Sequence, residues 1–255
     1  MASWIWAKAA VCGTAHLRKD LPLQDSVFAF SGITARDHNF FCGILSDGAG
    51  SALFGKRGAS IVCRSLSSLV RAHFRSEDEF PNEDLIFQWI DQVRDRIFIA
   101  AKHRDLVPRD FAATLVMVIC IEDRSQIIHI GDGSVALQPS LSQEWIVPSW
   151  PNNGEFASST YFITDESLSQ LRVLVTDCPI SRLVMFSDGL ERLALDFRAA
   201  TAFTPFCDAM SNPLLSSSAN GKDSSLSAAL SDYLQGDAVN ERTDDDKSLV
   251  IAVRR

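Results

Sequence analysis

The sequence predicts an α+β fold, and the order of its apolar segments indicates this class. Runs with β-like composition come in adjacent groups, first at 4–12, 26–30 and 40–45 and then in a longer series from residue 113 onwards. Two segments with helical spacing lie together between these groups. Grouped strands with helices in blocks are typical of α+β proteins, and a parallel dinucleotide-binding fold is a poor fit.

The two central helices are predicted by apolar residues spaced three and four apart. The first spans 55–75, and its apolar face is formed by Val62, Leu66, Leu69, Val70 and Phe74. The second begins after Pro81-Asn82, with Glu83 and Asp84 in its first turn. Its apolar stripe is Ile86, Trp89, Ile90, Val93, Ile97 and Ala101. Further helices are expected from Gly189 onwards and over 224–235.

Strands dominate the remaining chain. The expected runs are 113–121, 126–130, 134–138, 161–164, 182–187 and 248–253, and residues 122–125 between the first two suit a hairpin turn. The polar stretches 150–160 and 211–226 are expected to be surface loops. We find no internal repeat and no low-complexity linker, so residues 1–255 are expected to form one domain.

Composition excludes several classes of partner. The formal charge is -8, and no block of Lys and Arg is present, which argues against binding to nucleic acid or to an anionic membrane. No apolar run approaches the length of a membrane span. The 6 cysteines are scattered without a CxxC pair, which disfavours a zinc site and suits a reducing cytoplasm. We therefore expect a cytoplasmic globular protein.

Carboxylates stand at the ends of apolar strands in three places. Asp47-Gly48 and Asp188-Gly189 each follow a strand, and Asp244, Asp245 and Asp246 precede the last one. A buried aspartate must be hydrogen-bonded, paired with a cation or bound to a metal. Any one of these motifs alone could be an ordinary turn. Together they indicate an all-oxygen site for magnesium or manganese rather than zinc.

These motifs stand in a recognisable order. The motifs are GTAHLRKDLPLQDS (13–26), SDGAGS (46–51), DFAATLVMVI (110–119), IHIGDGSVAL (128–137), FSDGLE (186–191) and ERTDDDKSLVIAV (241–253). In this order they resemble the metal-dependent type 2C Ser/Thr protein phosphatases, the PPM family, in its compact bacterial branch. The resemblance covers essentially the whole chain.

The resemblance implies both a fold and an activity. The fold is a sandwich of two antiparallel β-sheets flanked by α-helices, with the metal site at one end of the sandwich. The activity is hydrolysis of phosphoserine and phosphothreonine by a hydroxide held between two Mn²⁺ or Mg²⁺ ions, with a possible third ion. The implied partners are phosphorylated proteins and a cognate Ser/Thr kinase.

The resemblance also assigns residues. Asp47 is expected to bridge the two ions, with the Gly48 carbonyl on one of them. Asp188 and Asp245 complete the shell of the first ion, and Asp25 lies at the second. Asp246, next to Asp245, is a further candidate metal ligand, although an indirect role is favoured for it over direct ligation. Asp110 is a candidate for a third ion, or else an ordinary surface carboxylate. Asp132 is expected to be structural.

The chain departs from the family pattern at three positions. Gln24 replaces a Glu, and Asp20 stands where relatives have a phosphate-binding arginine, so that Arg18 or Lys19 is expected to bind phosphate. Ala49 stands where relatives have a histidine that donates a proton to the leaving group. His16 is a candidate for that role in this chain. The alternatives are a pseudophosphatase that binds phosphoproteins, a magnesium phosphohydrolase with an aspartyl nucleophile, and a purely structural protein.

Overall fold

The structure, a computed structural model, describes residues 3–142, 144–152 and 160–255. Most of the loop expected at 150–160, namely residues 153–159, lies outside the described part. The described strands are β1 (Trp4–Val11), β2 (Ser26–Ile33), β3 (Asn39–Ser46), β4 (Leu115–Ile121), β5 (Arg124–Ile130), β6 (Ser134–Pro139), β7 (Arg172–Thr176), β8 (Ile180–Phe186), β9 (Leu195–Asp196), β10 (Thr201–Ala202), β11 (Gly221–Lys222) and β12 (Lys247–Arg254).

The described helices fall into two groups along the chain. Before β4 come α1 (Thr14–Arg18), α2 (Gly55–His73), α3 (Glu83–Lys102) and the 3₁₀ turn η1 (Pro108–Phe111). After β8 come the 3₁₀ turn η2 (Asp188–Leu190), α4 (Glu191–Ala194), α5 (Thr204–Leu215), α6 (Ser224–Gln235) and α7 (Asp237–Asn240). None of the helices in the described part is long and apolar enough to cross a membrane.

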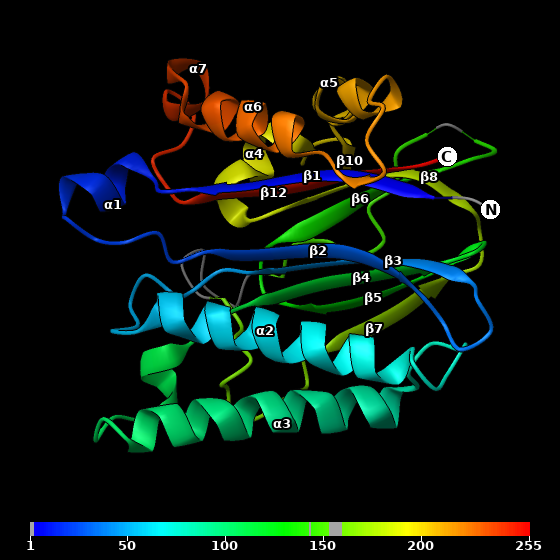
Figure 1. The fold of residues 1–255 in the computed structure, drawn as a ribbon. Helices are drawn as coiled ribbons and strands as arrows, with labels where there is room; N and C mark the ends of the chain where they lie inside the picture. The colour runs from blue at the N-terminus through cyan, green and yellow to red at the C-terminus, as the bar shows by residue number, and fades with distance from the viewer. Residues whose placement is uncertain (1–2, 143, 153–159) are drawn as a thin grey trace.

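Two five-stranded sheets form the centre of the molecule. One has the order β11-β1-β12-β8-β6 and the other the order β2-β3-β4-β5-β7. Neighbouring strands are antiparallel except β1 and β11, which run parallel. The sheets face each other, with α2 and α3 outside one and α5 and α6 outside the other, as Figure 1 shows. The chain is thus a four-layer sandwich, as expected.

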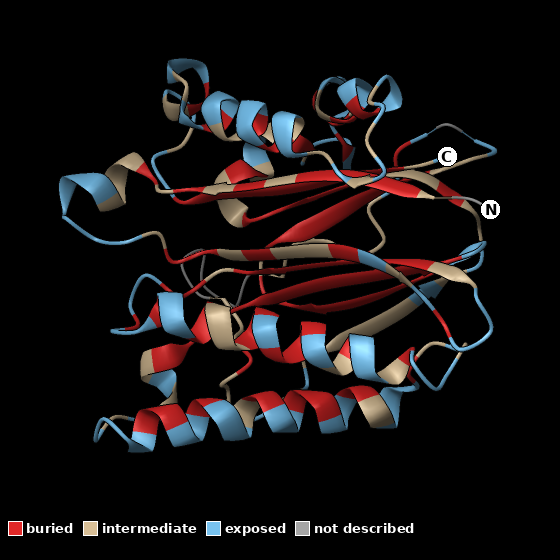
Figure 2. Cartoon of the chain, viewed as in Figure 1, coloured by how far each residue is buried: buried red, intermediate tan, exposed pale blue. Residues whose placement is uncertain are grey.

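Three apolar clusters hold these layers together. The cluster between the sheets includes Trp4, Phe41, Val116 and Met185, which come from both sheets. A second cluster joins α2 and α3 to the β2–β7 sheet, and a third joins the C-terminal helices to the other sheet. Figure 2 shows the same division, with buried strands and helices that are exposed on their outer faces. The strands are therefore covered on both faces.

The long helices agree with the sequence expectation because their apolar periodicity is strong. Helix α3 starts where predicted, and the Asn82 side chain accepts a hydrogen bond from the Leu85 backbone N–H at 2.9 Å. Helix α6 is capped in the same way by Asp223, which accepts from Leu226 N–H. The expected 122–125 turn is a two-residue hairpin in which Ile121 pairs with Arg124.

Three expectations were wrong in detail. Residues 161–164 form no strand, because a turn closes there, with the Phe162 N–H donating to the Asp165 carboxylate at 2.8 Å. The helix expected from Gly189 is only a 3₁₀ turn followed by α4. The loop expected at 211–226 begins inside α5, whose last turns pack Leu214 into the core, and contains β11. Strand β7 and helix α1 were not anticipated.

The packing of η1 against α2 yields a first prediction. A Cβ added at Gly58 in α2 would lie 2.0 Å from the Phe111 carbonyl oxygen, and backbone cannot move aside cheaply. We expect Gly58→Ala to lower the free energy of unfolding by about 1–3 kcal/mol, measured by urea denaturation. Gly50→Ala is the matched control, since nothing lies within 4 Å of its added Cβ. Equal stability of the two variants would contradict the prediction.

Candidate metal centre

Strand pairing brings two of the aspartates together at one edge of a sheet. Strands β2 and β3 are antiparallel, and Ser26 at the start of β2 pairs with Ser46 at the end of β3. Asp25 precedes the first of these residues and Asp47 follows the second, so the two aspartates emerge side by side. The Asp47 carboxyl lies at the base of a cleft of about 590 Å³.

The facing sheet repeats this arrangement. Phe186 at the end of β8 pairs with Leu249 near the start of β12. Asp188 therefore leaves this sheet beside the 244–246 turn, and Asp188, Asp244 and Asp245 all line the same cleft as Asp47. Both sheets thus direct strand-end carboxylates into one cleft, which is how two distant Ser-Asp-Gly motifs come to meet.

Asp132 joins this cluster from the connection between the sheets. It lies between β5 of one sheet and β6 of the other, and it lines the cleft. Its carboxylate accepts a hydrogen bond from the Thr160 hydroxyl and interacts electrostatically with Asp188 and Asp245. The sequence argument took Asp132 as structural, although its apolar strand and Asp-Gly ending are the signal that singled out Asp47.

Backbone contacts fix the position of Asp47. The Thr114 hydroxyl accepts a hydrogen bond from the Asp47 N–H at 3.0 Å, and the Thr114 N–H donates to the Asp47 carbonyl at 2.8 Å. The neighbouring Ser46 hydroxyl donates to the Thr114 carbonyl at 2.6 Å. The threonine of the central strand motif therefore locks the backbone that carries Asp47.

The second strand pair is locked in a related way. The Ser187 hydroxyl accepts from the Ser248 N–H at 3.0 Å, and the Ser187 N–H donates to the Ser248 carbonyl at 3.2 Å. Gly189 permits the close approach, because a Cβ there would lie 2.0 Å from the Asp246 carbonyl oxygen. Glycine is thus required for steric reasons next to Asp188.

The cluster is electrostatically strained in the absence of a counter-charge. Burial raises the pKa of Asp47 well above its ordinary value, and the neighbouring Asp25 and Asp188 carboxylates raise it further. Burial, with Asp132 and Asp245, raises the pKa of Asp188 to about 8. Burial raises the pKa of Asp25 to about 6, although the Ser248 hydroxyl opposes this shift. A cation is the natural compensation for such a group.

The donor atoms fit a hard divalent cation. Both Asp25 oxygens and Asp188 Oδ1 are buried without a well-formed hydrogen bond from the described residues. Buried carboxylate oxygens are normally satisfied, so these atoms require another partner. The cluster offers only oxygens, which suits magnesium or manganese. The residues present therefore fit the expected ions.

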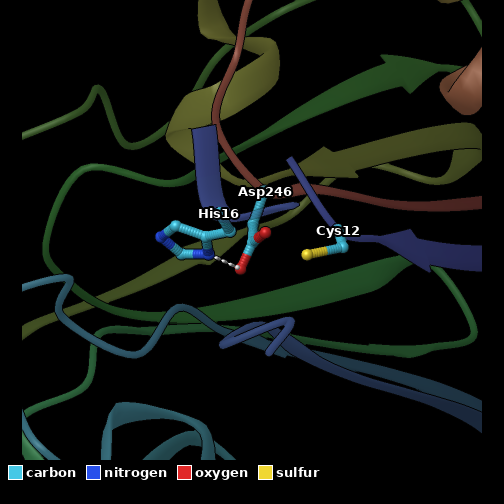
Figure 3. A group of neighbouring side chains, drawn as sticks. All are labelled: Cys12, His16 and Asp246. Carbon is cyan, nitrogen blue, oxygen red and sulfur yellow. Dashed lines mark ion pairs between the residues drawn. The ribbon is translucent and has the colours of Figure 1, made fainter. Parts of the chain in front are cut away.

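Asp246 differs from its neighbours because protein groups already occupy its oxygens. Oδ1 accepts a hydrogen bond from Gly13 N–H at 2.7 Å, and Oδ2 accepts one from Gln24 N–H at 2.6 Å. His16 Nδ1 lies 3.0 Å from Oδ2, and Cys12 stands on the opposite side, as Figure 3 shows. These contacts favour a positioning role for Asp246 over direct ligation, because it ties residues 13–24 to the site.

The basic residues of the site are not quite those that the sequence suggested. Lys19 lines the cleft, whereas Arg18 lies on the exposed rim, where it forms an ion pair with Asp244 at 2.8 Å. Arg109 lines the cleft as well, and its guanidinium has no hydrogen-bond or ion-pair partner among the described residues. Sequence reasoning missed Arg109, whose only signal is its place beside Asp110 in a family motif.

Asp110 lies next to the cleft rather than in it. Its carboxylate accepts a hydrogen bond from the Val107 N–H at 3.1 Å, which closes η1, and its carbonyl accepts from the Phe54 N–H at 2.7 Å. Asp110 is half-buried and keeps one carboxylate oxygen outside these contacts. The structure therefore gives it a clear local role in shaping η1.

Comparisons with known proteins agree with this geometry. The family described as "Protein phosphatase 2C" matches residues 12–235. The chain is 32% identical over 252 residues to "Serine/threonine-protein phosphatase 3" of Escherichia coli K12, covering 98% of each chain.

Solved structures share the fold at lower identity. PppA of Pseudomonas aeruginosa aligns with a TM-score of 0.65 at 14% identity, with 100% of each chain covered. The catalytic domain of the phosphatase PstP, solved in complex with 2 manganese ions, aligns with a TM-score of 0.61 at 17% identity over 100% of this chain and 99% of that one. With the family match and the full-length relative, the strand-end carboxylates show that this chain belongs to the protein phosphatase 2C family of metal-dependent Ser/Thr protein phosphatases.

Proposed function

We propose that the strand-end carboxylates hold two Mn²⁺ or Mg²⁺ ions and that the cleft hydrolyses phosphoserine and phosphothreonine in proteins. The observation that carries this proposal is the set of buried carboxylate oxygens on Asp25 and Asp188 that lack a well-formed hydrogen bond among the described residues, beside Asp47, whose pKa is raised well above its ordinary value. Bound in such a cleft, the ions would activate water as the nucleophile and offset the charge of the phosphoryl group. Because this water attacks the phosphorus directly, the reaction requires no nucleophilic side chain and no covalent intermediate.

The proposed ligands follow from their positions. Asp47 lies between Asp25 and Asp188, which suits it to contact both ions. The Gly48 carbonyl and Asp245 also border the cleft and complete the proposed set. We assign Asp246 to positioning, because its oxygens are engaged by backbone N–H groups. Asp110 remains the proposed ligand of a third, weaker site through its carboxylate.

Lys19 and Arg109 are the proposed phosphate-binding residues. Both line the cleft, and they come from separate segments of the chain. The Arg109 guanidinium has no partner among the described residues, so it could form two parallel hydrogen bonds to a phosphoryl group. Arg18 is proposed to act through Asp244, whose carboxylate it holds at the rim.

His16 is the proposed proton donor to the leaving serine or threonine oxygen. It lines the cleft, and Asp246 contacts its Nδ1, which leaves the other ring nitrogen available. An alkoxide is a poor leaving group unless it is protonated as the bond breaks. Ala49 offers no proton at the position where relatives carry a histidine.

The wider setting is also a proposal. All 6 cysteines lie in the described part of the chain and carry free thiols, which supports a reducing cytoplasm. Both sheets contribute to one shared core, which supports a single catalytic domain over residues 1–255. Phosphorylated proteins are the substrates, and a Ser/Thr kinase that acts on the same proteins is the expected opposing partner.

Loss of either central carboxylate should abolish turnover. We expect Asp47→Asn and Asp188→Asn each to lower manganese-dependent hydrolysis of p-nitrophenyl phosphate and of a phosphothreonine peptide by at least about 100-fold. Asp91→Asn, on the exposed face of α3, is the matched control and should be fully active. A wild type that binds the phosphopeptide with metal but does not hydrolyse it would support the pseudophosphatase instead.

The metal-free protein should become less stable as the pH rises. The pKa values of Asp25 and Asp188, about 6 and about 8 against an ordinary 3.8, mean that the folded state binds more protons than the unfolded state. The stabilisation is complete below about pH 4 and is lost as the pH rises through these values. We expect Tm in EDTA to fall across this range, and manganese to flatten the trend.

A comparison of wild type with Asp188→Asn isolates the source of that pH dependence. Asp188→Asn should show a shallower fall of Tm in EDTA than the wild type, because one of the titrating groups is gone. Burial lowers the pKa of His129 to about 3, so this residue destabilises the folded protein as the pH falls. His129 is present in both proteins, so its contribution cancels in the comparison. Identical profiles for wild type and variant in EDTA would show that the cluster does not produce the effect.

His16 can be tested by changing the leaving group. We expect His16→Gln to slow hydrolysis of a phosphothreonine peptide by about 100-fold but p-nitrophenyl phosphate by only a few-fold, because nitrophenolate leaves without a proton. His103→Gln, at the exposed end of α3, serves as the control. An equal loss on both substrates would indicate that His16 acts through the structure of the cleft rather than as a proton donor.

A further inference from the structure

A second cavity adjoins the catalytic cleft and is not used by the proposed chemistry. It has a volume of about 590 Å³ and lies between α3, η1 and the segment 164–166. We call it the flanking groove, and it is lined by Arg94, Asp95, Ile97, Phe98, Val107, Pro108, Arg109, Thr164, Asp165 and Glu166. Arg109 lines the catalytic cleft as well, so the two cavities share a wall.

A second chain segment also connects the two cavities. Phe162 lines the catalytic cleft, and Thr164, two residues later, lines the flanking groove. This wall is held in place rather than loose. The Ile163 N–H donates to the Ala113 carbonyl at 2.9 Å, and Arg94 donates to the Asp165 carbonyl at 2.9 Å. The groove is therefore formed before any ligand arrives.

The surface of the groove combines apolar and acidic groups. Phe98 and Val107 are 55% and 59% exposed, so the groove offers two large apolar side chains to a ligand. Asp95 and Glu166 are exposed, and their carboxylates form no hydrogen bond or ion pair with the described residues. Arg94 donates to the Asp165 carbonyl, and Arg109 lies where the groove meets the catalytic cleft, so Asp95 and Glu166 are the charged groups left to meet a bound chain along the groove. The groove thus suits an apolar side chain accompanied by a basic one.

We propose that the flanking groove binds the part of the phosphoprotein substrate next to the phosphorylated residue, with preference for an apolar residue beside a lysine or arginine. This rests on the proposed function, since a substrate whose phosphoryl group enters the cleft must lay its neighbouring residues on the rim. An extended chain advances about 3.3–3.6 Å per residue, so a few residues reach an adjoining cavity. Arg109 then stands between the phosphate and the bound segment.

The experiment compares two phosphothreonine peptides and p-nitrophenyl phosphate, all with manganese. One peptide carries a leucine and a lysine beside the phosphothreonine, and the other carries glycine and serine there. We expect Phe98→Ala to raise KM for the first peptide about ten-fold, with kcat and p-nitrophenyl phosphate hydrolysis unchanged. Ile99→Ala is the matched control, because Ile99 is 53% exposed on the same helix but lies outside the groove.

The charge preference is tested separately. Glu166→Gln should raise KM for the lysine-containing peptide by a few-fold and leave the glycine-serine peptide unaffected. Equal KM values for the two peptides with the wild type, or equal effects of Phe98→Ala and Ile99→Ala, would overturn the proposal. A dimer in light scattering that Phe98→Ala dissociates would assign the groove to a second copy of this chain and also overturn it. If the wild type hydrolyses none of the three substrates, the proposed function fails instead.

Discussion

Repulsion between carboxylates at one end of the sandwich is the constraint on which the rest of the structure depends. Asp25 is buried, Asp47 and Asp188 are half-buried beside it at the cleft, and each of the three has a raised pKa as a result. Gathering them costs free energy unless a cation joins them. The shared core between the two sheets offsets this cost, because apolar residues of both sheets are buried along the whole interface.

The contacts that position the site hold the backbone beside Asp47 and Asp188 rather than their carboxylates. Thr114 fixes the backbone of Asp47, and Ser187 with Ser248 fixes the strands beside Asp188. The close approach at Gly189 joins the η2 turn to the last loop. An aspartate that is held through its backbone keeps its carboxylate oxygens available for a metal, whereas a carboxylate that itself accepts hydrogen bonds is already satisfied. Asp246 illustrates the second case, since its engaged oxygens organise residues 13–24 instead.

The wall that separates chemistry from recognition is a single short element. Turn η1 carries Arg109 between the catalytic cleft and the flanking groove, and Gly58 of α2 allows η1 to pack closely. Phe162 and Thr164, on either side of Ile163, line the catalytic cleft and the flanking groove respectively, and the bond from Ile163 to Ala113 holds this segment in place. A peptide bound in the flanking groove would therefore contact Arg109, which also borders the catalytic cleft.

Elements with strong local signals were determined by the sequence itself. Apolar periodicity and the Asn82 cap specify α3, and the ordered Asp-Gly motifs predict the carboxylates of the proposed metal site through family resemblance. Tertiary structure decided the rest. β7 is a half-exposed edge strand without clear alternation, residues 161–164 form a turn because Asp165 caps it, and α5 continues through Pro213 because Leu214 is buried. Asp132 reaches the cleft because the chain passes there from one sheet to the other, between β5 and β6, and Arg109 reaches it because η1 packs beside α2. Both contacts join residues that are distant in sequence, and no local pattern encodes them.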